Sequence, residues 1–274
     1  GFYSASQLLQ DVRRHAVTVL PVDAQISQWL CTLEDIGESQ PAIRLGFVMI
    51  NGLGQEAGEQ VAACRPADGY QSTEDLQQRS QLSPRDLGVL AKANALVSLA
   101  GQRRQAWWQV RGLDAGVGLT AGKMALDATP ELPALSAGET VVADYASLGL
   151  TLGPHPLSLL RARLAERRLL TAHDIQQMPN GRPARCAGLV VTRQRPDTAS
   201  GVVFVTLEDE TGNTNVIVWS DLGEKQRREL LGAQLLGVFG VVQREGQVVH
   251  LLAKRLVDLS HWLGELVTES RDFR

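Results

Sequence analysis

Two alternating segments in the last third of this 274-residue chain carry side chains suited to holding a polynucleotide. Apolar and polar residues alternate along residues 202–207 and 215–219, which predicts two strands with one buried and one outward face. The outward face would carry Phe204, Thr206, Asn215 and Trp219. Aromatic rings on which bases stack, beside hydroxyl and amide groups, suit a single-stranded nucleic acid. The alternative interpretation of both rings is core packing or a protein interface.

A glycine-containing turn earlier in the chain offers backbone groups for a different contact. Residues 50–54 read apolar-Asn-Gly-Leu-Gly, and Gln55 begins a helical pattern. The two glycines let the backbone turn tightly and approach another group closely. The free N–H groups at the start of the new helix favour an anion such as a DNA phosphate. We therefore interpret Gly52, Leu53, Gly54 and Gln55 as the hairpin of a helix-hairpin-helix unit; an ordinary turn between two helices is the alternative.

Five arginines are candidates for the cations that such contacts need. A helix over residues 84–95 and another over 102–110 predict a second, degenerate hairpin, with Arg103 and Arg104 on a phosphate. The alternative is a solvated basic turn with Trp107 or Trp108 in the core. Beside the aromatic face, the supporting cations would be Arg193, Arg195 and Arg244.

The elements around the aromatic segments predict a small barrel. Strands are expected over residues 184–191, 202–207, 215–219, 234–242 and 247–256, with a helix over 221–231. Three strands, a helix and two strands is the order of an OB-fold, whose second and third strands bind oligonucleotides. The expected fold class is therefore α+β and multidomain: a helical tandem helix-hairpin-helix domain followed by a five-stranded β-barrel.

Composition limits the functional classes. The formal net charge is −3, so the chain lacks the global basic character of a tight, sequence-independent duplex binder. The three cysteines match no zinc spacing and leave an odd count, which favours a reduced, cytoplasmic setting without disulfides. No apolar run approaches the roughly 20 residues of a membrane helix, and no signal peptide is visible. We expect no metal and no cofactor in this chain.

Residues for phosphoryl-transfer or nucleophilic chemistry are not apparent in the sequence. The acidic run of residues 208–210 is expected to serve a turn and solubility, and the arginines of a helix over 157–169 to face solvent. We therefore expect no catalytic residue. A dinucleotide enzyme is one alternative, because Gly52, Gly54 and Ala57 fit a nucleotide fingerprint, but Glu74 follows a helix cap rather than a second strand.

Several segments together, in one order along almost the whole chain, resemble the C-terminal part of bacterial C-family DNA polymerases. They are residues 19–23, 43–46, 51–54, 149–152, 155–156, 207–209 and 211–213. Residues 1–4, 27–34 and 270–274 are similar to the error-prone, damage-induced branch that serves translesion synthesis in the bacterial mutasome. Residues 23–26 and Asn94 depart from the pattern, since the second hairpin usually has glycine at the latter position.

The resemblance implies an order of parts and a division of labour. The parts are the end of the fingers region (1–45), a tandem helix-hairpin-helix domain (46–112), a linker and helical segment (113–180), the OB-fold (181–262) and a C-terminal tail (263–274). The hairpins would contact primer–template duplex, and the OB-fold would lie on single-stranded template. The parent would be a magnesium-dependent DNA polymerase acting in SOS mutagenesis and DNA repair, with its catalytic palm outside this chain.

The resemblance also implies partners. No sliding-clamp peptide is visible between residues 113 and 144, so contact with the clamp is expected only through an inactive Y-family-like scaffold protein of the mutasome. The chain would then combine DNA binding with docking to that scaffold. The alternative is a purely protein-interaction module for the scaffold, without direct DNA contact.

Overall fold

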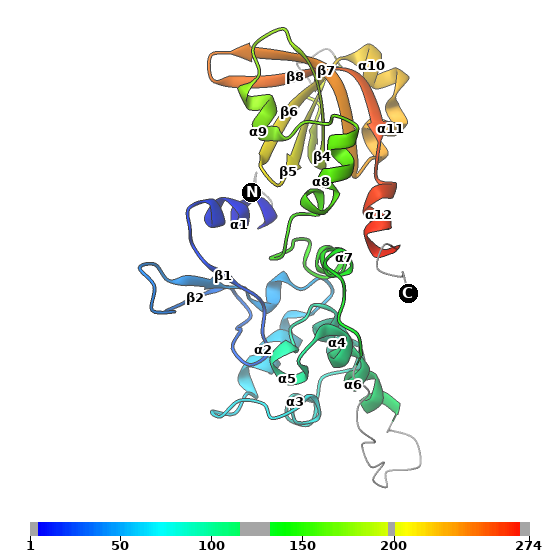
Figure 1. The fold of residues 1–274 in the computed structure, drawn as a ribbon. Helices are drawn as coiled ribbons and strands as arrows, with labels where there is room; N and C mark the ends of the chain where they lie inside the picture. The colour runs from blue at the N-terminus through cyan, green and yellow to red at the C-terminus, as the bar shows by residue number, and fades with distance from the viewer. Residues whose placement is uncertain (1–4, 116–131, 197–200, 269–274) are drawn as a thin grey trace. The chain divides into compact units, whose positions relative to one another are not determined.

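The computed structural model describes residues 5–115, 132–196 and 201–268, with the side chains of 114, 115, 267 and 268 left out. The chain divides into two compact units, Gly1–Gly153 and Pro154–Arg274. Helices α8 (Pro156–Glu166) and α9 (Ala172–Gln177) fall in the segment expected as a linker, but they lie in the second unit. Figure 1 shows helices dominating the first unit and a β-barrel dominating the second. None of the helices within the described residues is both long and apolar enough to cross a membrane.

The first unit begins with helix α1 (Ala5–Arg14) and a small sheet. Strands β1 (Val19–Leu20), β3 (Ala42–Arg44) and β2 (Thr32–Glu34) lie in the order β1-β3-β2. The almost buried Arg44 joins the strands, because its Nε donates to Glu34 at 2.8 Å and its Nη1 donates to the Pro21 carbonyl. The hydrogen bond from Arg44 lowers the pKa of Glu34 below its usual value.

The rest of the first unit is helical. Its elements are η1 (Phe47–Met49), α2 (Gln55–Ala63), α3 (Thr73–Ser80), α4 (Pro84–Lys92), α5 (Val97–Ala100), α6 (Arg103–Ala115) and α7 (Ala137–Leu148). The hydroxyls of Ser72 and Ser83 cap α3 and α4, as the sequence predicts. These helices share one core, in which Leu87, Leu90 and Leu96 are completely buried.

Part of the expected linker is a helix. Residues 116–131 lie outside the described part, but α7 begins at Ala137, inside the segment expected to lack regular structure. Its start has a local cause: Ser136 and Glu139 form a capping box, in which each side chain accepts a hydrogen bond from the other's backbone N–H. The glycine-rich and proline-rich composition before it concealed this signal.

The second unit contains the expected closed five-stranded barrel. Its strands are β4 (Pro183–Gln194), β5 (Val203–Asp209), β6 (Gly212–Val218), β7 (Leu235–Glu245) and β8 (Val248–Asp258). They close in the order β4-β5-β6-β8-β7, and only β6 and β8 pair in parallel. At Gly188 a Cβ would lie 2.7 Å from that of Leu207, so glycine permits β4 and β5 to approach closely.

The helical connection between β6 and β7 is broken, where one helix over residues 221–231 was expected. It consists of α10 (Ser220–Lys225) and α11 (Arg227–Gly232), separated at Gln226. The Gln226 amide donates to the Leu256 carbonyl at 2.9 Å and accepts from the Leu256 N–H at 2.7 Å. This pair of hydrogen bonds to β8 holds the break in place, and it depends on a residue distant in sequence.

The acidic run was expected to serve a turn and solubility, and the arginines of the basic helix to face solvent. Each expectation holds only in part, because Asp209 serves its turn but is buried, and Arg167 and Arg168 are exposed but Arg161 is not. Asp209 is 3% exposed and accepts from the backbone of Ala172 and Thr211. Arg161, on α8 (Pro156–Glu166), bonds to both Asp209 and Glu210 and so ties that helix to the barrel. The cause is tertiary: α8 and α9 (Ala172–Gln177) pack on the barrel where the run ends β5.

The last helix is held to α8 by arginine contacts. In α12 (His261–Thr268), Trp262 is completely buried. The guanidinium carbons of Arg163 and Arg167 lie 4.1 and 4.9 Å from the Trp262 ring centroid, and Arg163 also pairs with Glu265. These arginines therefore stabilise the second unit.

The three cysteines should differ sharply in reactivity. Burial raises the pKa of the Cys186 thiol to about 12, whereas Cys31 is exposed. At pH 8 we expect iodoacetamide to modify Cys31 at least roughly a hundredfold faster than Cys186, because the thiolate is the nucleophile. Mass spectrometry of digested protein measures both rates. Comparable rates in the folded chain would contradict the buried placement of Cys186, and denaturant should equalise them.

Candidate nucleic-acid interface

The four expected outward residues of the barrel lie on one surface, which we call the Phe204–Trp219 face (Phe204, Thr206, Asn215, Trp219). Phe204 is 36% exposed and Trp219 is 53% exposed. Thr206 is paired with Asn215 across β5 and β6, and its hydroxyl lies 3.4 Å from the Asn215 side-chain oxygen. Trp219 follows β6 directly as the N-cap residue of α10. The rings are therefore not sealed in the core, which removes that alternative.

Arg195 is one expected cation whose side chain stays free of an ion pair with any residue that the structure describes. It is exposed and directly follows β4. Its Nη2 lies 3.5 Å, and the Ser220 Cβ 3.2 Å, from the position that a Cβ on Gly201 would take. The guanidinium thus lies beside the residue that follows Trp219, where a strand stacked on that ring would carry phosphate.

The other two arginines expected beside the aromatic face, Arg193 and Arg244, bond to carbonyls at helix ends. Arg193 donates through Nε to the Leu230 carbonyl at 2.6 Å and through Nη2 to that of Ala233, at the end of α11. Arg244 donates to the carbonyls of Gln176 and Met178, at the end of α9. A helix end leaves such carbonyls unsatisfied, and a guanidinium is a suitable donor. These bonds engage both guanidinium groups within the second unit, and their contact with single-stranded DNA stays a prediction.

The glycine turn has the backbone shape that the sequence predicts. Gly52 has φ +84°, a left-handed conformation that favours glycine. Leu53 is buried and anchors the turn, while Gly54 is the N-cap residue of α2 and no side chain caps the helix. The N–H groups of the first turn of α2 therefore remain available to an anion. The exposed Gln55 side chain is used within the helix, donating to Glu59 at 2.8 Å.

The second hairpin turn lies between α4 and α5, before the expected arginines. Asn94 has φ +62° there and takes the left-handed conformation usually given to glycine, which asparagine tolerates better than most residues. Arg103 and Arg104 come later, at the start of α6. Arg103 pairs with the almost buried Asp144, and Arg104 pairs with Glu139 at 2.9 Å. Both guanidinium groups hold α7 against α6. Their contact with a DNA phosphate stays a prediction.

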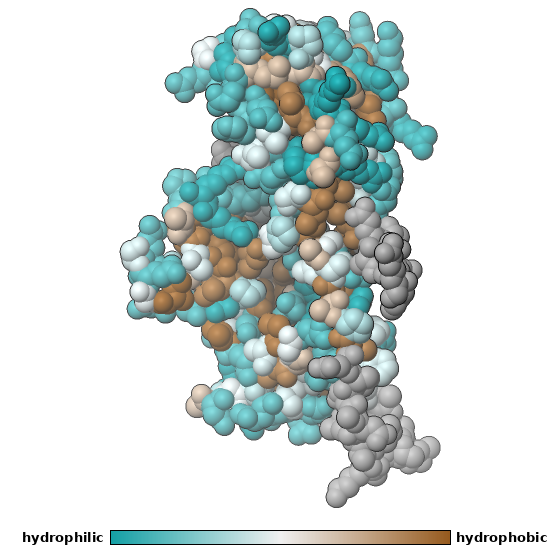
Figure 2. Space-filling view, in the orientation of Figure 1, coloured by the Kyte–Doolittle hydropathy of each residue, from teal (hydrophilic) through white to brown (hydrophobic). Residues whose placement is uncertain are grey.

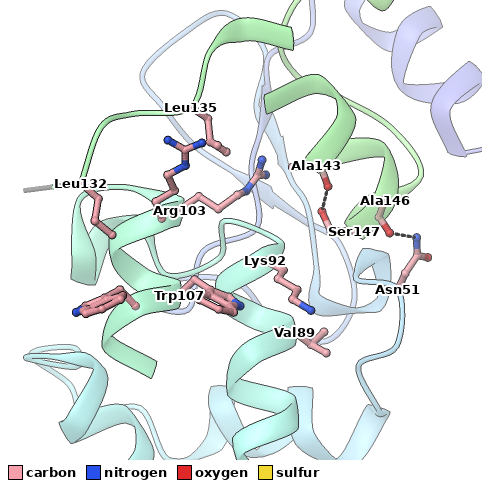
Figure 3. Close-up of a pocket in the computed structure, with 12 residues that line it drawn as sticks. Asn51, Val89, Lys92, Arg103, Trp107, Leu132, Leu135, Ala143, Ala146 and Ser147 are labelled. Atoms are coloured by element: carbon pink, nitrogen blue, oxygen red, sulfur yellow. Dashed lines mark hydrogen bonds between the residues drawn. The ribbon is translucent and has the colours of Figure 1, made fainter. Parts of the chain in front are cut away.

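A cavity of about 740 Å³ lies beside the first turn. One of its lining residues, Lys92, is a cation that the sequence analysis did not single out. Asn51, Lys92 and Trp107 are among its lining residues, and Figure 3 shows the Lys92 side chain next to Val89. The Lys92 side chain forms no hydrogen bond or ion pair with another described residue. Its signal in the sequence was its place as the last residue of α4, directly before the second turn.

Metal-binding potential is low in the same regions. Within residues 5–115, 132–196 and 201–268, no group of three or more His, Cys, Asp or Glu side chains gathers where it could hold a metal ion. The expectation that the chain carries no catalytic residue stays a prediction.

Two families match the two units. The family described as helix-hairpin-helix motif matches residues 16–106, and the family described as OB-fold nucleic acid binding domain matches residues 184–259. The first match includes both turns, at 51–54 and 93–96. The second includes all five barrel strands apart from the first residue of β4.

Curated relatives match the chain over its whole length. An error-prone DNA polymerase of Azoarcus sp. (strain BH72) is 53% identical, and the aligned part covers 100% of this chain and 26% of the relative. Error-prone DNA polymerases of Dechloromonas aromatica and Alkalilimnicola ehrlichii are 54% and 50% identical, with 26% and 27% of their lengths covered. The chain therefore spans about a quarter of the curated relatives that it matches.

Proposed function

Because this chain is similar over its whole length to one part of error-prone DNA polymerases, we propose that it grips DNA for such a polymerase without itself catalysing nucleotide transfer. In this proposal the Gly52–Gln55 turn holds a phosphate of the primer–template duplex. The Phe204–Trp219 face holds single-stranded template, with Arg195 supplying positive charge. The observation that carries the proposal is the exposure of both rings on the outer surface of an OB-type barrel.

The test is a fluorescence-anisotropy titration of the 274-residue chain. The ligands are a fluorescent single-stranded oligonucleotide of about 16 nucleotides, the upper site size of a single OB-fold, and a primer–template duplex. We expect both to bind, and both affinities to fall as salt rises because counterions are released from phosphate. If neither ligand binds at low salt, the proposal fails.

Replacing Gly54 by aspartate separates phosphate binding from folding. Gly54 has φ −74° and ψ 153°, which any residue adopts, and a Cβ there would meet no heavy atom within 4 Å. The carboxylate of an N-cap aspartate would accept hydrogen bonds from the free N–H groups of α2. It would also place a negative charge where the DNA phosphate is proposed to bind. We expect Gly54→Asp to lower duplex affinity roughly tenfold, the loss of one hydrogen-bonded charge contact.

The folding stability of Gly54→Asp should rise, or differ from that of the original chain by no more than a few tenths of a kcal/mol, because aspartate is at least as good an N-cap as glycine. Gly54→Ala is the matched control, since it adds a Cβ without a carboxylate and should bind duplex like the original chain. Anisotropy and urea unfolding measure the two effects. Unchanged duplex affinity in Gly54→Asp would remove these amide groups from the interface.

Partner docking is the second half of the proposal, and an exposed apolar group supports it. Between residues 26 and 48, four large apolar side chains are at least 44% exposed: Ile26, Leu30, Leu33 and Val48. Figure 2 shows apolar surface over the region of β1 and β2. Charge-poor, apolar surface of this kind suits a protein partner. We propose that the partner is the mutasome scaffold, through which the polymerase would reach the sliding clamp.

A pull-down with the scaffold tests this docking. The variant Leu30→Ser with Leu33→Ser should lose scaffold binding and keep DNA binding, because both residues lie in the first unit and away from its hairpin turns in sequence. Scaffold binding without any DNA binding by the original chain would favour the purely protein-interaction function. Action in damage-induced translesion synthesis in the cytoplasm, with magnesium at the catalytic site of the parent, completes the proposal.

A further inference from the structure

A third aromatic ring on the outer side of the barrel, the partly exposed Phe239, is flanked by arginines. Phe239, on β7, is paired directly with Arg185 of β4 on one side and with Arg255 of β8 on the other. The guanidinium carbons of Arg185 and Arg255 lie 5.8 and 5.5 Å from the ring centroid. At these distances both cations are attracted to the ring. With Lys254 these residues form what we call the Phe239 patch.

A β-bulge gives the patch its second cation on β8. Phe239 is paired with Arg255, and the next residue of β7, Gly240, is paired with Ala253, so Lys254 is the extra residue. Strict alternation would turn one of the two neighbouring basic side chains inward, but both Lys254 and Arg255 are exposed. Bulges re-aim side chains in this way. The bulge also requires Gly240, because a Cβ there would lie 2.2 Å from the Leu252 carbonyl oxygen.

The positive charges of the patch are not neutralised by neighbouring acids. The side chains of Arg185, Lys254 and Arg255 form no salt bridge or hydrogen bond with any residue in the described part of the chain. Glu245, at the β7–β8 turn, accepts instead from Gln243 at 2.8 Å. Two cations at one ring, with a third exposed cation next to them on β8, form a surface complementary to an anion that also has a flat apolar face.

The Phe239 patch includes residues of β8, the strand paired with β6. Ile217 of β6 is paired in parallel with Leu252 of β8. β6 ends at Val218 and Trp219 follows it, while Lys254 lies two residues beyond Leu252 on β8. Since neighbouring strands lie about 5 Å apart, a polynucleotide that leaves Trp219 would cross β8 at Lys254 and Arg255 and then reach Phe239 on β7.

We propose that the Phe239 patch is a second contact for single-stranded DNA, which extends the path of the strand from Trp219 across β8 and β7. The cations bind phosphates, and an unstacked base lies on Phe239 and the flanking guanidinium groups. Duplex DNA does not offer a free base face to such a ring, so the ligand is single-stranded. This inference rests on the proposed function of the barrel and adds a site to it.

The test compares salt-dependent binding of a single-stranded oligonucleotide of about 16 nucleotides to charge variants. The double variant Lys254→Gln with Arg255→Gln should lower affinity about tenfold and reduce the slope of log affinity against log salt by about 1.4, since two phosphate contacts are lost. Phe239→Leu should also lower affinity about tenfold. The matched control is Arg227→Gln with Arg228→Gln on α11, which removes the same charge from two exposed residues and should leave both quantities unchanged.

The outcomes separate this site from the proposed function. If all patch variants bind the oligonucleotide like the original chain, and alanine substitution of Phe204 and Trp219 abolishes binding, the proposed contact at the Phe239 patch is overturned. The proposed function then still stands. No single-strand binding by the original chain would overturn both. An equal loss in the α11 control, or binding of polyglutamate in preference to the oligonucleotide, would also overturn the patch.

A second measurement does not depend on variants. An oligonucleotide containing 5-iodouracil forms covalent links to stacked aromatic residues on irradiation, and mass spectrometry identifies the linked peptide. We expect links at Phe239 as well as at Phe204 or Trp219. Links confined to the latter two rings would show that the strand does not reach β7, against the proposal.

Discussion

Replacing both Phe204 and Trp219 by alanine is expected to lower the affinity of the chain for single-stranded DNA by at least about 30-fold. Base stacking on an aromatic ring contributes about 1–3 kcal/mol per base, so the loss of two rings removes at least about 2 kcal/mol. Both rings are exposed, and they lie on one surface with Thr206 and Asn215. Anisotropy with a single-stranded oligonucleotide measures the effect, and each single variant should give an intermediate loss.

The same double variant should keep its fold. Surface substitutions away from buried contacts usually change stability by no more than about 0.5 kcal/mol. Leu231→Ala is the matched control, because Leu231 is 53% exposed, like Trp219, but lies on α11. It should bind DNA like the original chain. Full affinity in the double variant would show that this face is not the binding surface, even if other parts of the chain bind DNA.

Asp209→Ala is expected to destabilise the second unit by about 3–5 kcal/mol, the usual cost of removing one partner from a buried charged network. The Asp209 carboxylate accepts from the backbone N–H groups of Ala172, Thr211 and Gly212, at 2.7, 2.7 and 3.1 Å. It also lies 3.4 Å from Arg161. Alanine leaves these buried donors without an acceptor, which costs more than the loss of the bonds alone.

Glu210→Gln is the control for this prediction. Glu210 binds the same Arg161 but is only partly buried, and it accepts no backbone N–H from α9. We expect its replacement to cost less than about 1 kcal/mol. Hydrogen exchange of the β5 and β6 amides, followed by mass spectrometry, measures the stability of this region separately from the first unit. Similar protection in Asp209→Ala and the original chain would be inconsistent with a structural role for this carboxylate.

The strand pattern of the barrel was readable from the sequence because alternation is a local property. Residues 202–207 and 215–219 show which side chains share a face, and pairing in the structure agrees with that division. The left-handed turn at Gly52 was readable for the same reason, since glycine there records a conformation of its own backbone. The Phe239 patch could not be predicted from the sequence, because the bulge that exposes Lys254 and Arg255 depends on pairing with β7.

The partners of charged residues were the least predictable feature. Arg193 and Arg244 were expected at single-stranded DNA, and Arg103 and Arg104 at duplex phosphate, yet all four bond to carbonyls or carboxylates within their own units. An arginine in a sequence shows that a charge is present, but its long side chain can reach a partner on a distant element. Only the packing of that element decides whether the charge stays free.

The sequence by itself determined the barrel, the hairpin turn and the outward rings, because each depends on local backbone preference or on the period of side chains along one element. The tertiary structure decided which cations remain available for DNA: Arg195, Lys92 and the Phe239 patch. It did so because the open helix ends at Leu230 and Met178 and the acids on α7 bind the other arginines, and those contacts exist only once the elements pack.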